Sequence, residues 1–593
     1  MKYGVSVLMP FLIFLAFFSF YSYSAHPTLS GGDSGEMSAT INSLGLAHPT
    51  GFPLYIITAK VFSLFLPISD AAYKFNLYSS FLTAASVTLL FLVLINLGIS
   101  STASFFATSI FGFGKTIWAH AGATSVYPIS LLFIVILLWI FTKWLSDRQM
   151  KYLYWYLFIW GVSFGTHALT ITMVAPLVQM LWQIRKSLNF KKISTAALLL
   201  LVPFLQYLYL PWAYARNTIA QFGKVDNFGG FIEYVTQRDY ANKIATRGVE
   251  GINIFINKTV TLFLSEFTII FFIISIIGLW ILFKKRLGLF LPLVSIIVIN
   301  LTILLSYGNS QDIYNLYRYF YPSYVIFAIG IAIIINSFLS KIGQSNRNTF
   351  LAILILAIII FFQARSSWVY NYEGNDYIVS DFANNILETA ENDSLILTAG
   401  DIVTGPLWYS QSVGKRTDLK IINVDLLSWD WYVKNEAKRN PDVVDIGLLD
   451  IKGNNKSEQR AIELIRKNIR DRTIYSIGTE IAGITDKNVT KEFDVWPVGI
   501  LYQVTTKNTV SVNDLLKVNN KAWSRYTLRR LKKELYKDPY EQDLPGVYSI
   551  ALTNLGVIYL RNGLNAEAKD AFLKALGLDP NNPRRMQNLK LVK

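Results

Sequence analysis

The sequence contains no cysteine, so the chain forms no disulfide bond and offers no thiolate to a metal ion. Charged residues are also scarce: they make up 16% of the 593 residues, while 52% are hydrophobic. Soluble domains contain about 25% charged residues on average, so this composition excludes a soluble protein of this length. It predicts an integral membrane protein. An exterior without disulfides is more typical of a bacterial protein than of one in a eukaryotic lumen.

Apolar segments recur through the first 365 residues and predict about eleven transmembrane helices. The run after Lys2 has the length of an uncleaved anchor, so we do not expect it to be a cleaved signal peptide. The predicted spans are residues 5–23, 77–97, 102–113, 128–144, 152–162, 169–182, 193–210, 260–283, 289–305, 324–339 and 350–362.

Lysine and arginine collect in alternate loops between the spans, as with Arg185 and Lys186 in one loop and Lys284 and Lys285 in a later one. Because basic loops favour the cytoplasmic side, the N-terminus is predicted inside, with Asp33 and the C-terminal region outside. In a bacterium this is the inner membrane, with the chemistry on the periplasmic side. The net charge of +16 comes partly from this bias, and without a nucleic-acid-binding motif it predicts no nucleic-acid partner.

The loop after the first span holds Asp33, Glu36 and His48, which is unusual chemistry for the edge of a membrane. One interpretation is structural: Asp33 is the N-cap of a helix over residues 34–44, Glu36 completes a capping box, and Gly45 ends the helix. The other is that the carboxylates act on a substrate. The local pattern favours neither, and the two are compatible because a helix N-terminus also favours a bound anion such as a lipid phosphate.

The order Asp33-Ser-Gly-Glu36, followed about a helix later by His48-Pro-x-Gly-x-Pro-Leu54, resembles the DUF2723 family, which includes the TMEM260-like protein O-mannosyltransferases. The resemblance implies a GT-C glycosyltransferase that takes a sugar, expected to be mannose, from a polyprenyl-phosphate donor. It also implies that Asp33 is the general base in the first external loop. Glu36 is then a second catalytic candidate, and His48 is a candidate for binding the substrate.

The second external loop departs from the family pattern. It keeps Trp118, Val126 and Tyr127, but Ser125 stands where the family has a glutamate. If relatives use that carboxylate to bind a metal ion or the acceptor, this chain must supply it from elsewhere, for example from Glu36. Tyr127 remains a substrate-binding candidate. The sequence leaves the presence of a metal ion unknown.

The segment Gly165-Thr-His167 matches a Gly-x-His pattern that the family shows at the outer end of a span. A lone histidine near a helix end more often serves packing. Its external depth favours a binding role equally, so His167 is a further substrate-binding candidate.

Arg216, Arg238 and Arg318 are candidates for the phosphate of the lipid donor, because a planar guanidinium suits phosphate oxygens. The first two lie in a long external loop, residues 211–256, that resembles a drifted form of a family loop. The alternative for each is an arginine that anchors its loop at the headgroup level. The tyrosines around Arg318 suit an interfacial aromatic belt.

Composition becomes charged and mixed after Arg365, which indicates a domain boundary. We expect a GT-C-like transmembrane domain over residues 1–365, with an external loop at 25–76. A soluble α/β domain should cover residues 366–520, because strand-like apolar runs alternate there with turns and helices. A helical segment of the tetratricopeptide (TPR) type is expected over residues 521–593.

Within the α/β region, the segment Gly400-Asp401, continuing to Pro406-Leu-Trp-Tyr409, is similar to the corresponding segment of bacterial relatives. A carboxylate after a strand could belong to a site, but a turn carboxylate is the favoured interpretation of Asp401. The last segment fits the TPR spacing, and its expected role is to dock the acceptor or a partner protein. The residues at the TPR signature positions are Leu555, Gly556, Tyr559, Ala568, Phe572, Ala575 and Pro580.

These observations predict a membrane glycosyltransferase that moves a sugar to Ser or Thr hydroxyls of exported proteins. A polyprenyl phosphate leaves as a stabilised anion, so one carboxylate acting as a base is sufficient. Two alternatives stay open. One is a transferase that glycosylates a lipid or an envelope polysaccharide. The other is a transporter, which would need charged residues at mid-span depth, and the predicted spans are nearly free of them.

Overall fold

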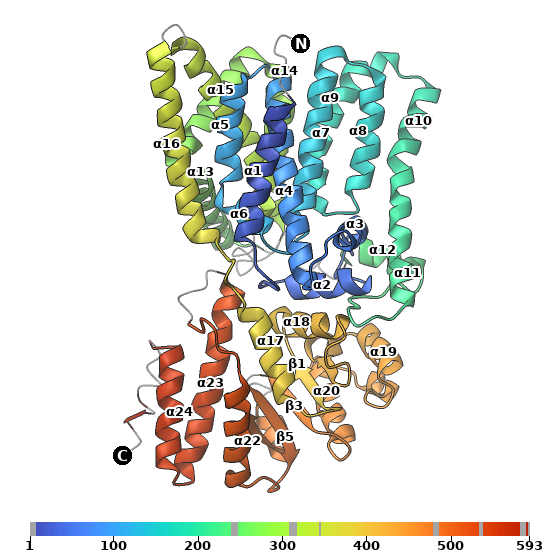
Figure 1. The fold of residues 1–593 in the computed structure, drawn as a ribbon. Coiled ribbons are helices and arrows are strands. Elements are labelled where there is room, and N and C mark those ends of the chain that lie inside the picture. The colour runs from blue at the N-terminus through green and yellow to red at the C-terminus, as the bar shows by residue number, and fades with distance from the viewer. Residues whose placement is uncertain are drawn as a thin grey trace. The chain divides into compact units, whose positions relative to one another are not determined.

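A computed structural model describes residues 7–238, 247–307, 317–342, 346–477, 486–532, 538–580, 587 and 589–590 (Figure 1). The chain divides into two compact units. Two segments from the N-terminal half belong to the second unit together with the C-terminal region. The first unit comprises Met1–His26, Pro49–Trp212 and Asn227–Asn375, and the second comprises Pro27–His48, Ala213–Asp226 and Asp376–Lys593.

The first unit is helical wherever regular structure is described. Its helices are long and apolar, as a hydrocarbon environment requires, because every backbone hydrogen bond is then made within the helix. They are α1 (Leu8–Ser24), α3 (Pro53–Leu64), α4 (Ala71–Asn96), α5 (Ser101–Gly112), α6 (Lys115–Ala121), α7 (Tyr127–Asp147), α8 (Met150–Ser163), η1 (Ala168–Met173), α9 (Val174–Ile184), η2 (Arg185–Ser187), α10 (Phe190–Leu201), η3 (Val202–Leu208), α11 (Tyr209–Ala215, whose last residues belong to the second unit), α12 (Phe228–Val235), α13 (Val249–Lys285), α14 (Leu287–Ser306), α15 (Tyr321–Ile342) and α16 (Asn346–Asn371).

Over the residues that the structure describes, every predicted span coincides with helical structure. Among the described residues, seven helical segments are long and apolar enough to cross a membrane. The other predicted spans coincide with the shorter helices α1, α5, α8 and η1–α9. The chain is therefore a multi-pass helical membrane protein, as its composition predicts. The seven segments are Ala71–Asn96, Tyr127–Asp147, Phe190–Ala215, Val249–Lys285, Leu287–Ser306, Tyr317–Ile342 and Asn346–Asn371.

Small residues allow close approach between spanning helices in the first unit. A Cβ added to Gly278 in α13 would lie 2.0 Å from the backbone oxygen of Gly330 in α15. Ser275 Oγ donates a hydrogen bond to the backbone oxygen of Phe327 at 2.9 Å across the same contact. Small residues and hydroxyl bonds of this kind hold helices together in lipid, where no hydrophobic force drives them to associate.

The second unit is built on a five-stranded sheet in the order β2-β1-β3-β5-β4. β1 lies parallel to β2 and β3, while β5 is antiparallel to both β3 and β4. β1 and β3 are buried along their whole length, as expected for central parallel strands covered on both faces. The strands are β1 (Leu395–Thr398), β2 (Lys420–Asn423), β3 (Ile474–Ile477), β4 (Phe493–Val498) and β5 (Leu501–Thr506).

Helices connect the parallel strands and continue past the sheet, so the predicted alternation of strands and helices is present. α23 packs against α24, and a Cβ on Gly556 would lie 2.6 Å from the ring of Phe572. A TPR identity and a docking role for this helix pair stay predictions, as do the domain boundaries. The helices are α2 (Ser34–Ser43), α17 (Ile378–Thr389), α18 (Asp401–Ser412), η6 (Asp425–Ser428), α19 (Asp430–Arg439), η7 (Ile446–Asp450), α20 (Lys456–Asn468), α21 (Asp486–Glu492), α22 (Val512–Arg525), α23 (Pro539–Arg561) and α24 (Asn565–Leu578).

Candidate active site

Asp33 stands at the N-cap of α2, but its carboxylate does not cap the helix. Its backbone oxygen accepts a hydrogen bond from Met37 N at 2.9 Å, while its side chain accepts no capping bond from any described residue. The capping-box interpretation is therefore wrong for Asp33. Its side chain is half-buried.

Glu36 is bonded to His48 instead of to the N-terminus of α2. Glu36 Oε1 accepts a hydrogen bond from the backbone N of His48 at 2.7 Å, and Glu36 Oε2 lies 2.8 Å from His48 Nδ1. The side chain of Glu36 is 6% exposed and that of His48 is 23% exposed. One carboxylate thus fixes both the backbone and the ring of His48, which holds the end of this loop against α2.

His48 carries a positive charge at neutral pH. Burial lowers the pKa of its imidazole, but the Glu36 carboxylate, by its charge and its hydrogen bond, outweighs that effect, and Asp33 and Asp401 act in the same direction. The resulting pKa is about 9. A cation therefore lies beside the carboxylate of Asp33.

α18 packs directly against α2, and the contact needs glycine on both helices. A Cβ on Gly35 would lie 2.6 Å from the backbone of Gly405, too close for any other residue. Asn42 Nδ2 donates a hydrogen bond to the backbone oxygen of Ser412 at 2.7 Å, near the C-terminal ends of both helices. The two contacts join matching parts of the helices, so α2 and α18 run in the same direction and their N-terminal ends meet.

Asp401 is the first residue of α18, so its interpretation as a turn carboxylate is wrong. Although Asp401 keeps exposed surface, the surrounding protein partly desolvates its carboxyl, and the charges of Glu36 and Asp33 add to this effect, raising its pKa to about 7. Sequence reasoning missed Asp401 as a neighbour of the first loop. The similarity of its segment to bacterial relatives was the signal that could have found it.

Arg216 binds the other end of α2. Its Nη1 donates hydrogen bonds to the backbone oxygens of Ser43 at 2.9 Å and Leu44 at 3.1 Å. Carbonyls at a helix C-terminus lack partners within the helix and attract cations, so this contact is favourable. The structure thus gives Arg216 a structural contact, and its role as a phosphate ligand stays a prediction.

The segment Ala213–Asp226 joins the loop of His48 to α19. Leu46 pairs with Gln221 as a parallel bridge. The ring of Phe222 lies 6.2 Å from that of His48 and 6.1 Å from that of Trp431. Phe222 of this segment therefore packs between the imidazole of His48 and the ring of Trp431.

In the first unit, a second set of predicted site residues comes together. Tyr127 and His167 have ring centroids 5.2 Å apart, and the guanidinium of Arg318 lies 5.1 Å from the Tyr127 ring. Tyr319 contacts both rings, at 5.4 Å from Tyr127 and 5.6 Å from His167. We call these residues the Tyr127 cluster. Their predicted role in binding substrate stays a prediction.

His120 borders the Tyr127 cluster and is neutral. Burial and then the charge of Arg318 lower its pKa to about 3. Ser125, which replaces the family glutamate, has its hydroxyl 3.4 Å from His120 Nδ1. Arg238, by contrast, forms an exposed ion pair with Glu233 at 2.8 Å, and its role as a phosphate ligand stays a prediction.

Glu266 is a carboxylate that sequence reasoning missed. It is buried inside α13, and its oxygens accept hydrogen bonds from the backbone N of Thr116 at 2.7 Å and of Ile117 at 3.4 Å. It therefore caps the N-terminus of α6, where Gly114 offers no capping side chain. Glu266 stands in an apolar run, and the helix that it caps is distant in sequence. The residues around it therefore did not indicate this role.

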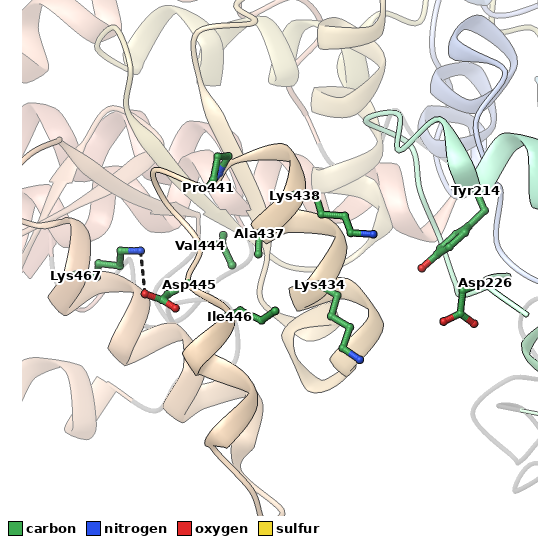
Figure 2. A pocket seen from close by; sticks show the side chains of 10 residues that line it. All are labelled: Tyr214, Asp226, Lys434, Ala437, Lys438, Pro441, Val444, Asp445, Ile446 and Lys467. Carbon is green, nitrogen blue, oxygen red and sulfur yellow. Dashed lines mark hydrogen bonds and ion pairs between the residues drawn. The ribbon is translucent and has the colours of Figure 1, made fainter.

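A cavity of about 480 Å³ lies in the second unit beside α19, and Figure 2 shows the side chains around it. Predicted site residues do not line it. The residues that do are Tyr214, Asp226, Lys434, Ala437, Lys438, Pro441, Val444, Asp445, Ile446 and Lys467.

Two family models match the chain. Residues 33–191 match the protein O-mannosyl-transferase TMEM260 N-terminal domain, and residues 379–534 match TMEM260-associated domain 2. The predicted family resemblance is therefore confirmed. The first match begins at Asp33, and the second contains α17 except its first residue, α18 and the whole sheet.

The chain is similar to two named relatives. It is 23% identical to mouse protein O-mannosyl-transferase TMEM260 over 449 residues, which cover 70% of this chain and 62% of that protein. It is 24% identical to the Dictyostelium discoideum protein O-mannosyl-transferase tmem260 over 477 residues, covering 71% of this chain and 58% of that protein. The chain thus spans about three fifths of the length of these relatives.

The fold is that of a GT-C membrane glycosyltransferase. The structure aligns with ArnT from Cupriavidus metallidurans bound to undecaprenyl phosphate with a TM-score of 0.57, over 84% of this chain and 97% of ArnT, at 10% identity. The same enzyme without ligand aligns with a TM-score of 0.54. At this identity the likeness establishes the fold alone, and it confirms the predicted fold class.

Proposed function

We propose that this chain, a TMEM260-like protein with the GT-C fold, is a membrane glycosyltransferase that moves a sugar, expected to be mannose, from a polyprenyl-phosphate donor to Ser or Thr hydroxyls of proteins. Asp33 is the general base. The names of the two relatives and of the ArnT complex support the reaction class and the donor class. We further propose that the enzyme lies in a bacterial inner membrane with this site on the periplasmic side, as the one-sided basic loops favour.

One observation carries the assignment of the base. Of the two carboxylates in the Asp33–Glu36 motif, Glu36 is bonded twice to His48, whereas the side chain of Asp33 makes no capping bond with any described residue and remains half-buried. Both oxygens of Glu36 are already engaged by the backbone N and the ring of His48, so this carboxylate is held in a structural contact. Asp33 is therefore the better base, and Glu36 serves the site by holding His48.

The proposed reaction is a displacement at the sugar's anomeric carbon. Asp33 accepts the proton of the acceptor hydroxyl as its oxygen forms a bond to that carbon. The bond from the carbon to the phosphate oxygen breaks, and the polyprenyl phosphate leaves with the electron pair. The leaving group is already a stable anion, so no general acid is required.

The charges around Asp33 suit this reaction. The imidazolium of His48 supplies a cation where negative charge moves onto the phosphate, and a positive helix end at α2 acts in the same sense. Arg216, Arg238 and Arg318 stay candidates for the donor phosphate, and Tyr127 and His167 stay candidates for binding substrate. A requirement for a divalent metal ion stays open.

The proposal is tested with purified protein, a labelled donor and separated acceptors. Polyprenyl-phosphate mannose carrying a radiolabel is incubated with the chain and with periplasmic protein, lipid or polysaccharide in parallel. We expect label on protein, released by base-catalysed β-elimination as for a sugar on Ser or Thr. Label on lipid or polysaccharide instead would contradict the proposed acceptor, and no transfer from mannose, glucose or galactose donors would contradict the reaction itself.

A further inference from the structure

We propose that the cavity beside α19 binds an acidic segment of the acceptor polypeptide, and that Lys434 and Lys438 recognise its carboxylates. The inference rests on the proposed function, because it takes the acceptor to be a protein. It adds a binding site and a substrate preference: acceptor hydroxyls near Asp or Glu residues should be used best.

Among the described residues, the cavity lining has more positive charges than negative partners for them. Asp226 forms an ion pair with Lys224 at 3.2 Å, and Asp445 forms one with Lys467 at 3.5 Å. Lys434 and Lys438 form no ion pair and no hydrogen bond with any residue that the structure describes. After the internal pairs are removed, two positive charges remain on the cavity wall.

The two lysines lie on the same exposed face of α19. They stand four residues apart on α19, so they lie one turn apart on the same face, where like charges repel. Figure 2 shows the side chain of Lys438 extending toward Tyr214, and that of Lys434 leaving the helix on the side that faces Asp226. An anionic ligand between them would relieve the repulsion and gain two charge-assisted contacts.

The rest of the lining suits a peptide better than a bare anion. Between the lysines and beyond them lie the apolar side chains of Ala437, Val444 and Ile446, and Ile446 is 62% exposed. A volume of about 480 Å³ is in the range of ligand sites and admits a few residues of an extended chain. Carboxylates placed next to aliphatic carbon are what an acidic polypeptide segment offers.

The cavity shares a wall with the candidate active site. The segment Ala213–Asp226 contributes Tyr214 and Asp226 to the lining, and between them Phe222 lies 6.2 Å from the ring of His48. The buried side of α19 holds this segment, because Asn435 Oδ1 accepts a hydrogen bond from Tyr214 Oη at 3.3 Å. A polypeptide bound in the cavity therefore lies along the same segment that borders the imidazolium.

The experiment compares two charge reversals on the full chain in detergent. The test variant is Lys434→Glu with Lys438→Glu. The matched control is Lys517→Glu with Lys521→Glu, which reverses another exposed pair four residues apart, on α22 and outside the cavity. Fluorescence anisotropy measures binding of a labelled Ser/Thr peptide flanked by Asp and Glu, and of a peptide in which Asn and Gln replace them.

We expect the wild type to prefer the acidic peptide and the test variant to bind it about tenfold more weakly, since two attractions become repulsions. The control variant should bind like the wild type, and added salt should weaken binding of the acidic peptide. A peptide with Lys and Arg flanks should bind the test variant better than the wild type.

The site is overturned if the wild type binds both peptides equally, or if the control variant loses as much affinity as the test variant. It is also overturned if the test variant loses binding to vesicles that contain anionic lipid, while wild type and test variant bind the acidic peptide equally. Binding needs no sugar donor, so the proposed function is judged separately. Transfer without an acidic preference contradicts the cavity alone, and binding without any transfer contradicts the transferase alone.

Discussion

The ion pair between Glu36 and His48 should make the stability of the second unit depend on pH. The pKa of His48 is raised from its ordinary value of 6.5 to about 9. Because the folded state binds the proton more tightly, this contribution is complete below about pH 6.5 and is lost as the pH rises through 9. The difference between the two pKa values, at about 1.4 kcal/mol per pH unit, corresponds to roughly 3 kcal/mol.

Glu36→Gln removes the charge and keeps the size of the side chain. An amide oxygen still accepts the hydrogen bond from the backbone N of His48, so the loss should be mostly electrostatic. We expect the variant to be less stable than the wild type by roughly 3 kcal/mol at pH 6, and by about 1 kcal/mol or less at pH 9.5. The assay is thermal unfolding in detergent, followed by tryptophan fluorescence at both pH values.

A matched control is Glu233→Gln, which breaks the ion pair with Arg238. Both side chains of that pair are mostly exposed, so the change should cost less than about 1 kcal/mol at either pH. The reasoning is refuted if the gap between wild type and Glu36→Gln is the same at pH 6 and pH 9.5. It is refuted equally if the Glu233→Gln control shows the pH-dependent loss instead.

Three further outcomes are expected, two from the contacts and one from the basic loops. Gly35→Ala should destabilise the second unit by about 1–3 kcal/mol, because its Cβ would lie 2.6 Å from the backbone of Gly405; unfolding like the wild type would contradict the packing of α2 on α18. Arg216→Ala should cost about 1 kcal/mol through its bonds at the end of α2, and an unchanged KM for the lipid donor would end its candidacy as a phosphate ligand. The chain has no cysteine, so single cysteines at the exposed positions Thr509 and Ser187 can test topology: an impermeant thiol reagent applied outside should label the first, and labelling of the second instead would reverse the orientation.

Hydropathy was sufficient to predict the membrane helices. A helix in lipid must be apolar along its length, so its presence is written locally in the sequence. The main exception inside these helices is Glu266, whose partners at Thr116 and Ile117 lie about 150 residues earlier. That pairing depends on how α13 and α6 pack, which no local pattern reveals.

The sequence indicated which residues of the first loop could act in a site, but it did not predict the contacts that they make. Asp33 and Glu36 fit a capping box on spacing alone, and the structure shows Glu36 bonded to His48 instead. Asp401 joins them from the α/β region because Gly35 and Gly405 let two helices touch. Spacing reports neighbours along the chain, whereas this site is assembled by a helix contact across about 370 residues.

The contacts of the candidate phosphate ligands could likewise not be predicted from the sequence. A positive charge in an external loop predicts an anion, but at Arg216 the negative partners are the carbonyls at the end of α2. Tyr127, His167 and Arg318 were selected separately, and their meeting in one cluster depends on the packing of the first unit.

The central claim is that the carboxylate of Asp33 takes the proton of the acceptor, and Asp33→Asn tests it most directly. Asparagine keeps the size of the side chain, and because that side chain makes no capping bond with any described residue, Asp33→Asn and Asp33→Ala should be equally stable. Neither replacement accepts a proton, so sugar transfer at saturating donor should fall at least ~100-fold in both. An Asp33→Asn protein that unfolds like the wild type and transfers sugar at the wild-type rate would contradict the claim and remove Asp33 from the chemistry.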